Sequence, residues 1–139
     1  MIEPVGPRDG GAGDHRIPFE LAISASATAV GHARNALHRR LEQWRCGNID
    51  DVTLVFSELA TNAFRHAGSS STAVITHGDD EIRVAVHDTS HSIPHLVPVS
   101  SSPGGYGLVI VDRVSDRWGW DQTASGKTVW SVIRCRNCG

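Results

Sequence analysis

The stretch that most constrains the fold is residues 51–67, DVTLVFSELATNAFRHA, which the apolar spacing predicts to be one amphipathic helix. At about 100° per residue, one broad sector of the helix surface collects the apolar side chains Val52, Val55, Phe56, Leu59, Ala60 and Ala63. Glu58, Asn62 and His66 follow one another at intervals of four and form a polar row along one border of that sector. We therefore expect this helix to lie on a sheet, with the polar row at the rim of the core.

Glu58 and Asn62 admit two interpretations at this point. Helices commonly carry Glu and Asn on their solvent side, where these side chains have no further role. A carboxylate and a carboxamide one turn apart, beside an apolar face, would also suit a metal–phosphate site. The helix alone does not decide between a solvated face and a ligand site.

The composition is that of a single globular domain. The chain has 139 residues, of which 40% are hydrophobic and 20% charged, enough to bury a real core. A net charge of -2 and a pI near 6.4 give no electrostatic reason to expect nucleic acid. The sequence shows no run of about 18 apolar residues and no charged-then-apolar leader. We therefore expect a cytoplasmic protein without a membrane segment.

The two ends of the chain differ from the middle. Residues 1–14, MIEPVGPRDGGAGD, are rich in Gly and Pro and contain little to bury. This predicts a disordered leader at 1–14, one domain at 15–134 and a C-terminal tail at 135–139.

The three cysteines do not form the pattern of a disulfide framework, since Cys46 is far in sequence from the other two. Cys135 and Cys138 form a lone Cys-x-x-Cys pair, whereas a structural zinc site needs about four ligands. The pair is either an incidental part of a frayed tail or half of a metal or redox site.

Apolar alternation predicts five strands, at residues 15–23, 72–76, 81–87, 117–122 and 128–134. The second and third strands flank a short turn and should form an antiparallel hairpin. In the first strand, the residues expected to face inward are Ile17, Phe19, Leu21 and Ile23.

Helical spacing predicts two further helices, at 27–45 and 108–115. Ser24 or Ser26 is placed to cap the first of them, and its expected buried residues are Val30, Ala33, Leu37, Leu41 and Trp44. The order of the elements favours an α+β two-layer sandwich, with a mixed, mainly antiparallel sheet and the helices on one face.

Residues 89–103 contain three prolines and several serines without a sustained period, which predicts a long loop of the kind that forms a lid or a binding segment. Gly104, Gly105 and Gly107 follow it and lead into the helix at 108–115. Glycine allows close approach of the backbone to a ligand, and a helix N-terminus favours phosphate. A tight connection without any ligand explains the glycines equally well.

Asp88 ends a strand whose apolar residues Val84 and Val86 point to the core. A carboxylate at that place needs a partner, because burying an unpaired charge is unfavourable. The exocyclic amine of a purine would satisfy it, and so would a backbone turn with Thr89 and Ser90. Taken by itself, the segment favours the turn.

Four motifs occur together in a fixed order: ELATNAFRH at 58–66, VHDTS at 86–90, GYGLVIVD at 105–112 and GKTVW at 126–130. Together they resemble the N, G1, G2 and G3 boxes of the Bergerat-type ATP-binding fold, the GHKL superfamily of gyrase, histidine kinases, heat-shock chaperones and mismatch-repair ATPases. Within it, the chain is most similar to the small bacterial anti-sigma factor and serine-protein kinases of the stand-alone actinobacterial type. The similarity covers residues 17–133.

The resemblance implies a role for the residues of the first two motifs. Asn62 would ligate the Mg²⁺ that bridges the phosphates of ATP, and Glu58 would be the general base. His66 completes the first motif and is placed at the nucleotide. Asp88 would accept a hydrogen bond from the adenine amino group, with Thr128 of the last motif assisting.

The third motif is implied to cover the phosphates. Gly105 and Gly107 would let the lid close, and the backbone N–H groups of Leu108 and Val109 would hold the phosphates. The chain also departs from the family pattern. Ser90 stands where Gly is more common, and residues 89–103 contain no Lys or Arg to stabilise a transferred phosphate.

The resemblance implies one of two functions. The first is an ATP-dependent serine/threonine protein kinase that phosphorylates a small antagonist protein and uses ATP and Mg²⁺. The second is a binding module, with or without nucleotide, that sequesters a partner without chemistry. The partners implied are a sigma factor, an anti-sigma antagonist protein or both, and a homodimer is a further expectation.

Overall fold

The computed structural model describes residues 17–91 and 107–135. In chain order its elements are β1 (Phe19–Ile23), α1 (Ala27–Gln43), α2 (Ile49–Ala67), β2 (Ser71–His77), β3 (Glu81–Asp88), α3 (Gly107–Val114), β4 (Arg117–Thr123) and β5 (Gly126–Arg134). Every predicted helix and strand is present, in the predicted order. The predicted leader, most of the lid and all of the tail after its first residue lie outside the described residues.

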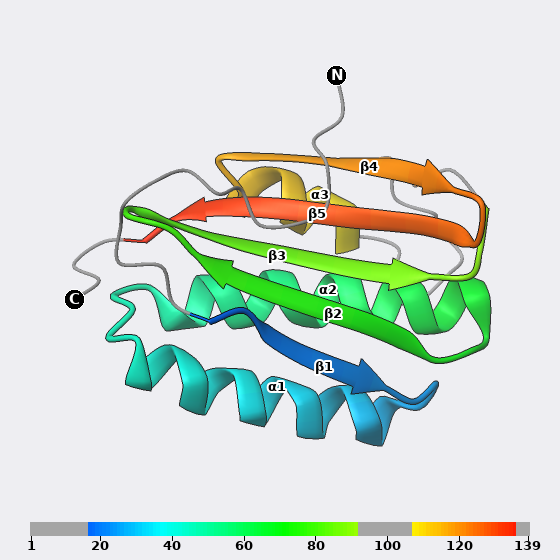
Figure 1. Cartoon of the computed structure of the whole chain (residues 1–139), viewed down its shortest axis with the longest axis horizontal. Helices are drawn as coiled ribbons and strands as arrows, with labels where there is room; N and C mark the ends of the chain where they lie inside the picture. Colours follow the sequence, from blue (N-terminus) through cyan, green and yellow to red (C-terminus); the bar gives the residue numbers. More distant parts are fainter. Residues whose placement is uncertain (1–16, 92–106, 136–139) are drawn as a thin grey trace.

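The strands form one sheet in the order β1-β2-β3-β5-β4, as Figure 1 shows. β2 and β3 form the predicted hairpin, and β5 lies between β3 and β4. All four neighbouring pairs are antiparallel, so the sheet is antiparallel throughout and not mixed. The predicted α+β two-layer architecture is otherwise confirmed.

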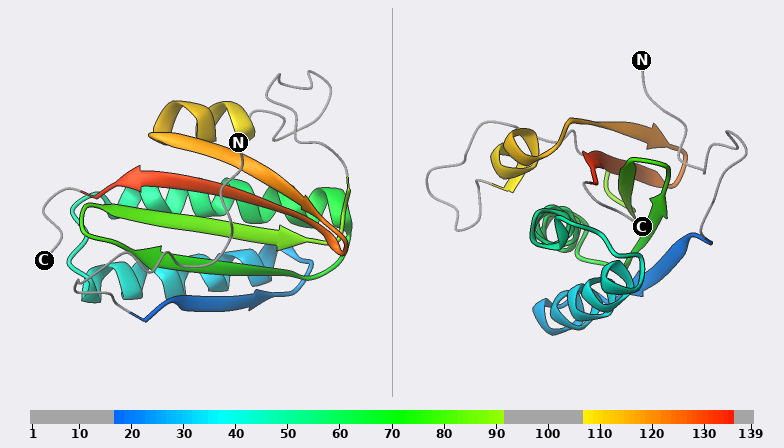
Figure 2. Two further views of the ribbon diagram at one scale, coloured as in Figure 1. Left: turned by 45° about the horizontal axis from the view of Figure 1, so that its top comes forward. Right: turned by 90° about the vertical axis from the view of Figure 1, so that its left-hand side faces the viewer.

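The helices cover one face of this sheet (Figure 2). α1 and α2 pack against each other, while α3 contacts α2 and β4. The main core lies between the helices and the sheet. Because strand side chains alternate between faces, a second and smaller cluster lies on the opposite face; it consists of Ala85, Trp130 and Val132.

α2 buries the predicted apolar sector completely: Val52, Val55, Phe56, Leu59, Ala60 and Ala63 are each at most 2% exposed. The helix begins at Ile49, earlier than predicted, and Asn48 at its N-cap makes no side-chain cap bond. The amide nitrogen of Asn48 instead donates to the backbone oxygen of Arg134 at 2.8 Å. Asn48 therefore ties the start of α2 to the end of β5.

Capping residues define the start of α1 and the end of α2. Ser26 caps α1, since its hydroxyl oxygen accepts from the backbone N–H of Ala29 at 3.0 Å. Gly68 ends α2 with a φ of 65°, a left-handed conformation that favours glycine. α1 ends at Gln43, slightly before the predicted limit, and Arg45 has a φ of 57°. All of its predicted core residues are buried, namely Val30, Ala33, Leu37, Leu41 and Trp44.

The prediction for the first strand was wrong at its start. β1 begins at Phe19, and Ile17 is 80% exposed instead of facing inward. Pro18 lies between them and has no N–H group with which to pair along the strand.

The prediction of an incidental frayed tail was wrong at Cys135, which lies next to Cys46 in the fold. Both residues are buried, and their sulfur atoms lie 3.1 Å apart although the residues are far apart in sequence. Cys135 is disulfide-bonded and is not part of a frayed tail, whereas Cys46 is a free thiol. The thiol of Cys46 donates to the side-chain oxygen of Asn48 at 3.3 Å, and burial raises its pKa.

Within residues 17–91 and 107–135, none of the helices has the length and apolar character that crossing a membrane requires. This finding agrees with the amphipathic pattern of α2, in which one face only is apolar.

We expect Phe56→Ala to lower the free energy of unfolding by about 3 to 5 kcal/mol, because it opens a cavity under the centre of α2. Phe56 is fully buried, whereas Leu54 on the same helix is 40% exposed. Leu54→Ala is therefore the matched control and should change the stability little. Urea denaturation followed by circular dichroism measures both, and equal losses would contradict the assigned orientation of α2.

We expect Cys46 to react with iodoacetamide far more slowly in the native protein than after denaturation, at neutral pH. Burial limits access, and the raised pKa keeps the sulfur as the less reactive thiol. The rate should rise with pH only above the range of an ordinary cysteine. Mass spectrometry of the alkylated chain gives the measurement, and rapid labelling of the native protein would contradict the packing at the α1–α2 connection.

Candidate functional site

α2 carries Glu58 and Asn62 one turn apart, next to its buried sector. Both side chains are partly buried, as expected at the rim of the core. The backbone of His66 lies in the last turn of the same helix, while its side chain is outside the described part of the structure. The structure therefore brings together the first two residues of the predicted polar row and leaves the third as a prediction.

The environment of Glu58 suits a proton acceptor. Partial burial raises the pKa of the Glu58 carboxyl above its usual value of 4.5, and the positive charge of Arg65 offsets part of this effect. A raised pKa makes the ionised carboxylate a stronger base. This is the electrostatic property that a general base requires.

Asp88 is 2% exposed and forms a buried ion pair with Lys127, which is 1% exposed. The ammonium nitrogen of Lys127 lies 3.1 Å from each of the two carboxylate oxygens. The residues are direct neighbours across β3 and β5. Lys127 lies between Gly126 and Thr128, a sequence that superficially resembles a phosphate-binding motif. In the structure, its ammonium group contacts the carboxylate of Asp88 instead.

The backbone turn that the sequence allowed after Asp88 is also present. The N–H of Ser90 donates to the Oδ1 atom of Asp88 at 2.7 Å. The carboxylate thus has both a turn partner and a cationic partner. Sequence reasoning considered only the first of these, because the partner of Asp88 on β5 depends on the register between two strands that are far apart in the chain.

Gly126 allows this close approach of β3 and β5. A Cβ atom at Gly126 would lie 1.9 Å from the backbone oxygen of Asp88, and the glycine has a φ of 151°. No other residue fits both the contact and the backbone conformation without a shift. Gly126 consequently fixes the position of Asp88 at the end of β3.

The hydroxyl of Thr128 lies on the other face of the sheet. It is hydrogen-bonded to the Nδ1 atom of His87 at 3.0 Å, and these two residues are cross-strand neighbours. Alternation places the side chains of Thr128 and Asp88 on opposite faces. Lys127, and not Thr128, lies beside Asp88, and the predicted assistance of Thr128 at the adenine stays a prediction.

The start of α3 provides the backbone groups predicted to hold phosphate. Leu108 and Val109 lie in its first turn, where N–H groups lack partners within the helix. α3 packs on α2, which carries Asn62. Gly107 begins the helix, and Gly105 lies outside the described residues, so the lid remains a prediction.

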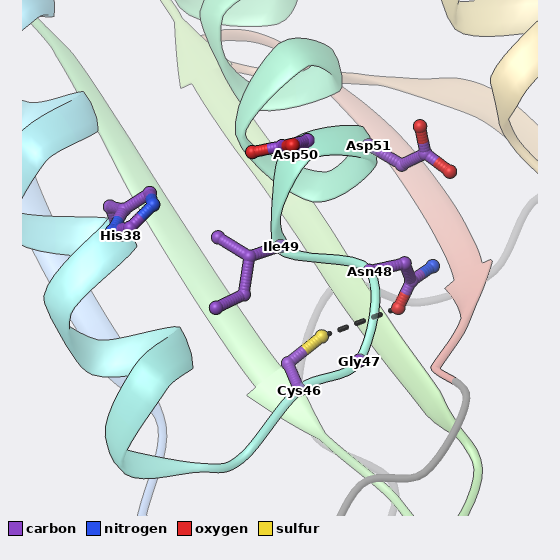
Figure 3. Close-up of a pocket in the computed structure, with 7 residues that line it drawn as sticks. All are labelled: His38, Cys46, Gly47, Asn48, Ile49, Asp50 and Asp51. Atoms are coloured by element: carbon purple, nitrogen blue, oxygen red, sulfur yellow. Dashed lines mark hydrogen bonds between the residues drawn. The ribbon is translucent and has the colours of Figure 1, made fainter.

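A surface pocket of about 440 Å³ lies at the opposite end of α2 (Figure 3). Its lining includes His38 of α1 and Asp50 and Asp51 in the first turn of α2. At about 1.5 Å per residue, Asp50 is about 18 Å along the helix from Asn62. This pocket is therefore separate from the residues of the four motifs.

The described residues offer the kinds of metal ligand and hydrogen-bonding group that a nucleotide with Mg²⁺ requires. Within these residues, no three His, Cys, Asp or Glu side chains gather as a metal site. An ion at Asn62 would thus take most of its ligands from phosphate oxygens and water, as Mg²⁺ commonly does. The free N–H groups at the start of α3 suit the phosphates, and the buried Asp88 suits a hydrogen-bond donor on a base.

Comparisons with known proteins agree with this fold. The model of the histidine kinase-like ATPase domain matches residues 23–133. Among solved structures, the RsbU and RsbW domains of Rv1364c from Mycobacterium tuberculosis are similar, with a TM-score of 0.67 at 20% identity. That match covers 86% of this chain and 32% of the other, so this chain spans about a third of its length. None of the curated proteins matches.

The family match includes all four motifs, from the end of β1 to the last residues of β5. It thus covers the helix with Glu58 and Asn62 as well as the strand end with Asp88. This chain belongs to the family of histidine kinase-like ATPase domains.

Proposed function

We propose that this domain binds ATP with Mg²⁺ and transfers the γ-phosphate to a serine or threonine of a regulatory protein. The observation that carries the proposal is the position of Glu58 and Asn62, one turn apart on α2 at the rim of the core, with the pKa of Glu58 raised by burial. In a phosphoryl transfer, a carboxylate can accept the proton of the attacking hydroxyl and a carboxamide can ligate the metal ion on the phosphates.

Each residue has a defined part in the reaction. Glu58 accepts the proton of the attacking hydroxyl while the hydroxyl oxygen bonds to the γ-phosphorus, and the bond to the bridging oxygen breaks to release ADP. Asn62 holds the metal ion, which neutralises charge on the phosphates. The N–H groups of Leu108 and Val109 orient the phosphates, and Asp88 orients the base.

The partner we propose is a sigma factor, an anti-sigma antagonist or both, in the cytoplasm. The support is the fold shared with a structure that contains an RsbW domain, together with the motif resemblance. The second candidate is a module that binds its partner without phosphoryl transfer, and a homodimer is compatible with either. The absence of Lys and Arg from residues 89–103 favours this second candidate, since no cation of the predicted lid can stabilise the transferred phosphate.

We expect Asn62→Ala to weaken magnesium-dependent ATP binding about tenfold or more, because the substitution removes a metal ligand. Thr61→Ala, at the next position on α2, is the matched control and should bind like the wild type. Calorimetric titration of nucleotide-free protein with ATP, with and without Mg²⁺, gives both affinities. If the folded wild-type protein released no heat and did not bind ADP, nucleotide binding would be excluded.

We expect Glu58→Gln to lower phosphoryl transfer by about 10²- to 10⁴-fold, since the amide cannot accept the proton. ATP affinity should stay unchanged. Transfer is measured as labelled phosphate on serine or threonine of proteins retained by the immobilised chain, and Glu42→Gln on α1 is the control. Transfer that persists in Glu58→Gln would exclude Glu58 as the base, and the absence of transfer with all variants would favour the binding module.

The raised pKa of Glu58 determines how both activity and stability depend on pH. The transfer rate should fall as pH drops through the raised pKa, so the acid limb lies above the usual 4.5. Stability changes in the opposite direction. Because the folded state binds the proton more tightly, the Glu58 contribution to stability decreases as pH rises from 4.5 through the raised pKa. Glu58→Gln should therefore melt no lower than the wild type at neutral pH, and a clearly lower melting temperature would contradict this.

A further inference from the structure

The Asp88–Lys127 pair leaves hydrogen-bonding capacity unused on both partners. An ammonium group has three N–H donors. Among the described residues, the Nζ atom of Lys127 contacts only the two oxygens of Asp88, each at 3.1 Å. At least one donor of this nearly fully buried group is therefore left over.

The same count applies to the carboxylate. An ionised Asp accepts about four hydrogen bonds, two at each oxygen. The Oδ1 atom of Asp88 accepts from Ser90 and Lys127, whereas the Oδ2 atom accepts from Lys127 alone among the described residues. One acceptor position on Oδ2 is therefore also left over.

The pair faces the helices. Asp88 has the same alternation as Val86 on β3, and Lys127 the same as Val129 on β5; both valines belong to the main core between sheet and helices. α2, which carries Asn62, packs on β3. The spare donor and acceptor thus lie on the side of the sheet that holds the rest of the candidate site.

We propose that Lys127 is a specificity residue of the nucleotide site and donates a hydrogen bond to a ring nitrogen of the base while Asp88 accepts from the neighbouring amino group. This inference rests on the proposed nucleotide binding. The edge of adenine fits the pair, because its N6 amino group is a donor and the adjacent N1 is an acceptor. Asp88 by itself would recognise only the amino group.

A purely structural role for Lys127 would leave a different signature. A lysine that only neutralises Asp88 would affect folding and would weaken all nucleotides alike. A lysine that contacts N1 makes binding sensitive to that one atom of the base. The structural role and the role in base recognition are therefore distinguished by the ratio of the affinities for a nucleotide with N1 and one without it. Neither affinity alone distinguishes them.

The test compares ATP with 1-deaza-ATP, in which a C–H group replaces N1, by calorimetric titration of the full chain. We expect the wild type to bind ATP about tenfold or more tightly than the analogue, the value of one hydrogen bond from a charged donor. Lys127→Met should bind the two ligands equally. Arg117→Met, which breaks the exposed ion pair with Glu81, is the matched control and should keep the wild-type ratio.

Lys127→Met leaves Asp88 buried without its cation and could therefore misfold. A second variant avoids this problem. The double variant Asp88→Asn with Lys127→Met contains a neutral pair and should also lose the ratio. If the variants without Lys127 kept the preference for ATP, the proposed contact would be overturned while nucleotide binding stood. A wild type that preferred ITP to ATP would overturn the adenine assignment, and a wild type that bound none of these nucleotides would overturn the proposed function itself.

Discussion

The packing of α2 on the sheet is the interaction on which the candidate site depends. Six apolar residues of this helix are almost completely buried, and they fix its rotation about its own axis. Glu58 and Asn62 lie at the border of the buried sector, so their positions follow from apolar packing and not from contacts of their own. The hydrophobic core thereby holds a carboxylate and a carboxamide one turn apart on a rigid element, as the proposed phosphoryl transfer requires.

The second constraint is the register of β3 against β5. Gly126 opposes the end of β3 so closely that a side chain cannot fit, and this contact places Lys127 directly opposite Asp88. A buried ion pair contributes little net stability, because desolvation of the two charges offsets most of their attraction. The pair therefore does not account for the stability of the fold, and its unused donor and acceptor are better explained by a ligand.

Residues that depend on local pattern were predictable from the sequence, whereas those that depend on long-range register were not. The spacing of Val52, Phe56 and Ala63 predicted the buried face of α2. Lys127 was missed, although its alternation with Val129 and Ile133 could have placed it on the inner face. Thr128 was assigned by motif to the adenine, yet the same alternation places its hydroxyl at His87 on the opposite face. The contact between Cys46 and Cys135 likewise joins segments that no local pattern relates.

Glu58 and the Asp88–Lys127 pair share a physical property that links the two ends of the candidate site. The carboxyl of Glu58 is less favourably ionised in the fold than in water, because burial raises its pKa. The buried pair retains a donor and an acceptor for which the described residues offer no further partner. In both places the fold accepts a loss of solvation that its own contacts only partly offset. A bound nucleotide that supplied the missing hydrogen bonds to Asp88 and Lys127 would recover part of the lost solvation energy there. At Glu58, the same loss of solvation makes the carboxylate more basic, which would favour proton transfer. We therefore expect the function to be carried by residues whose lost solvation the fold replaces only in part.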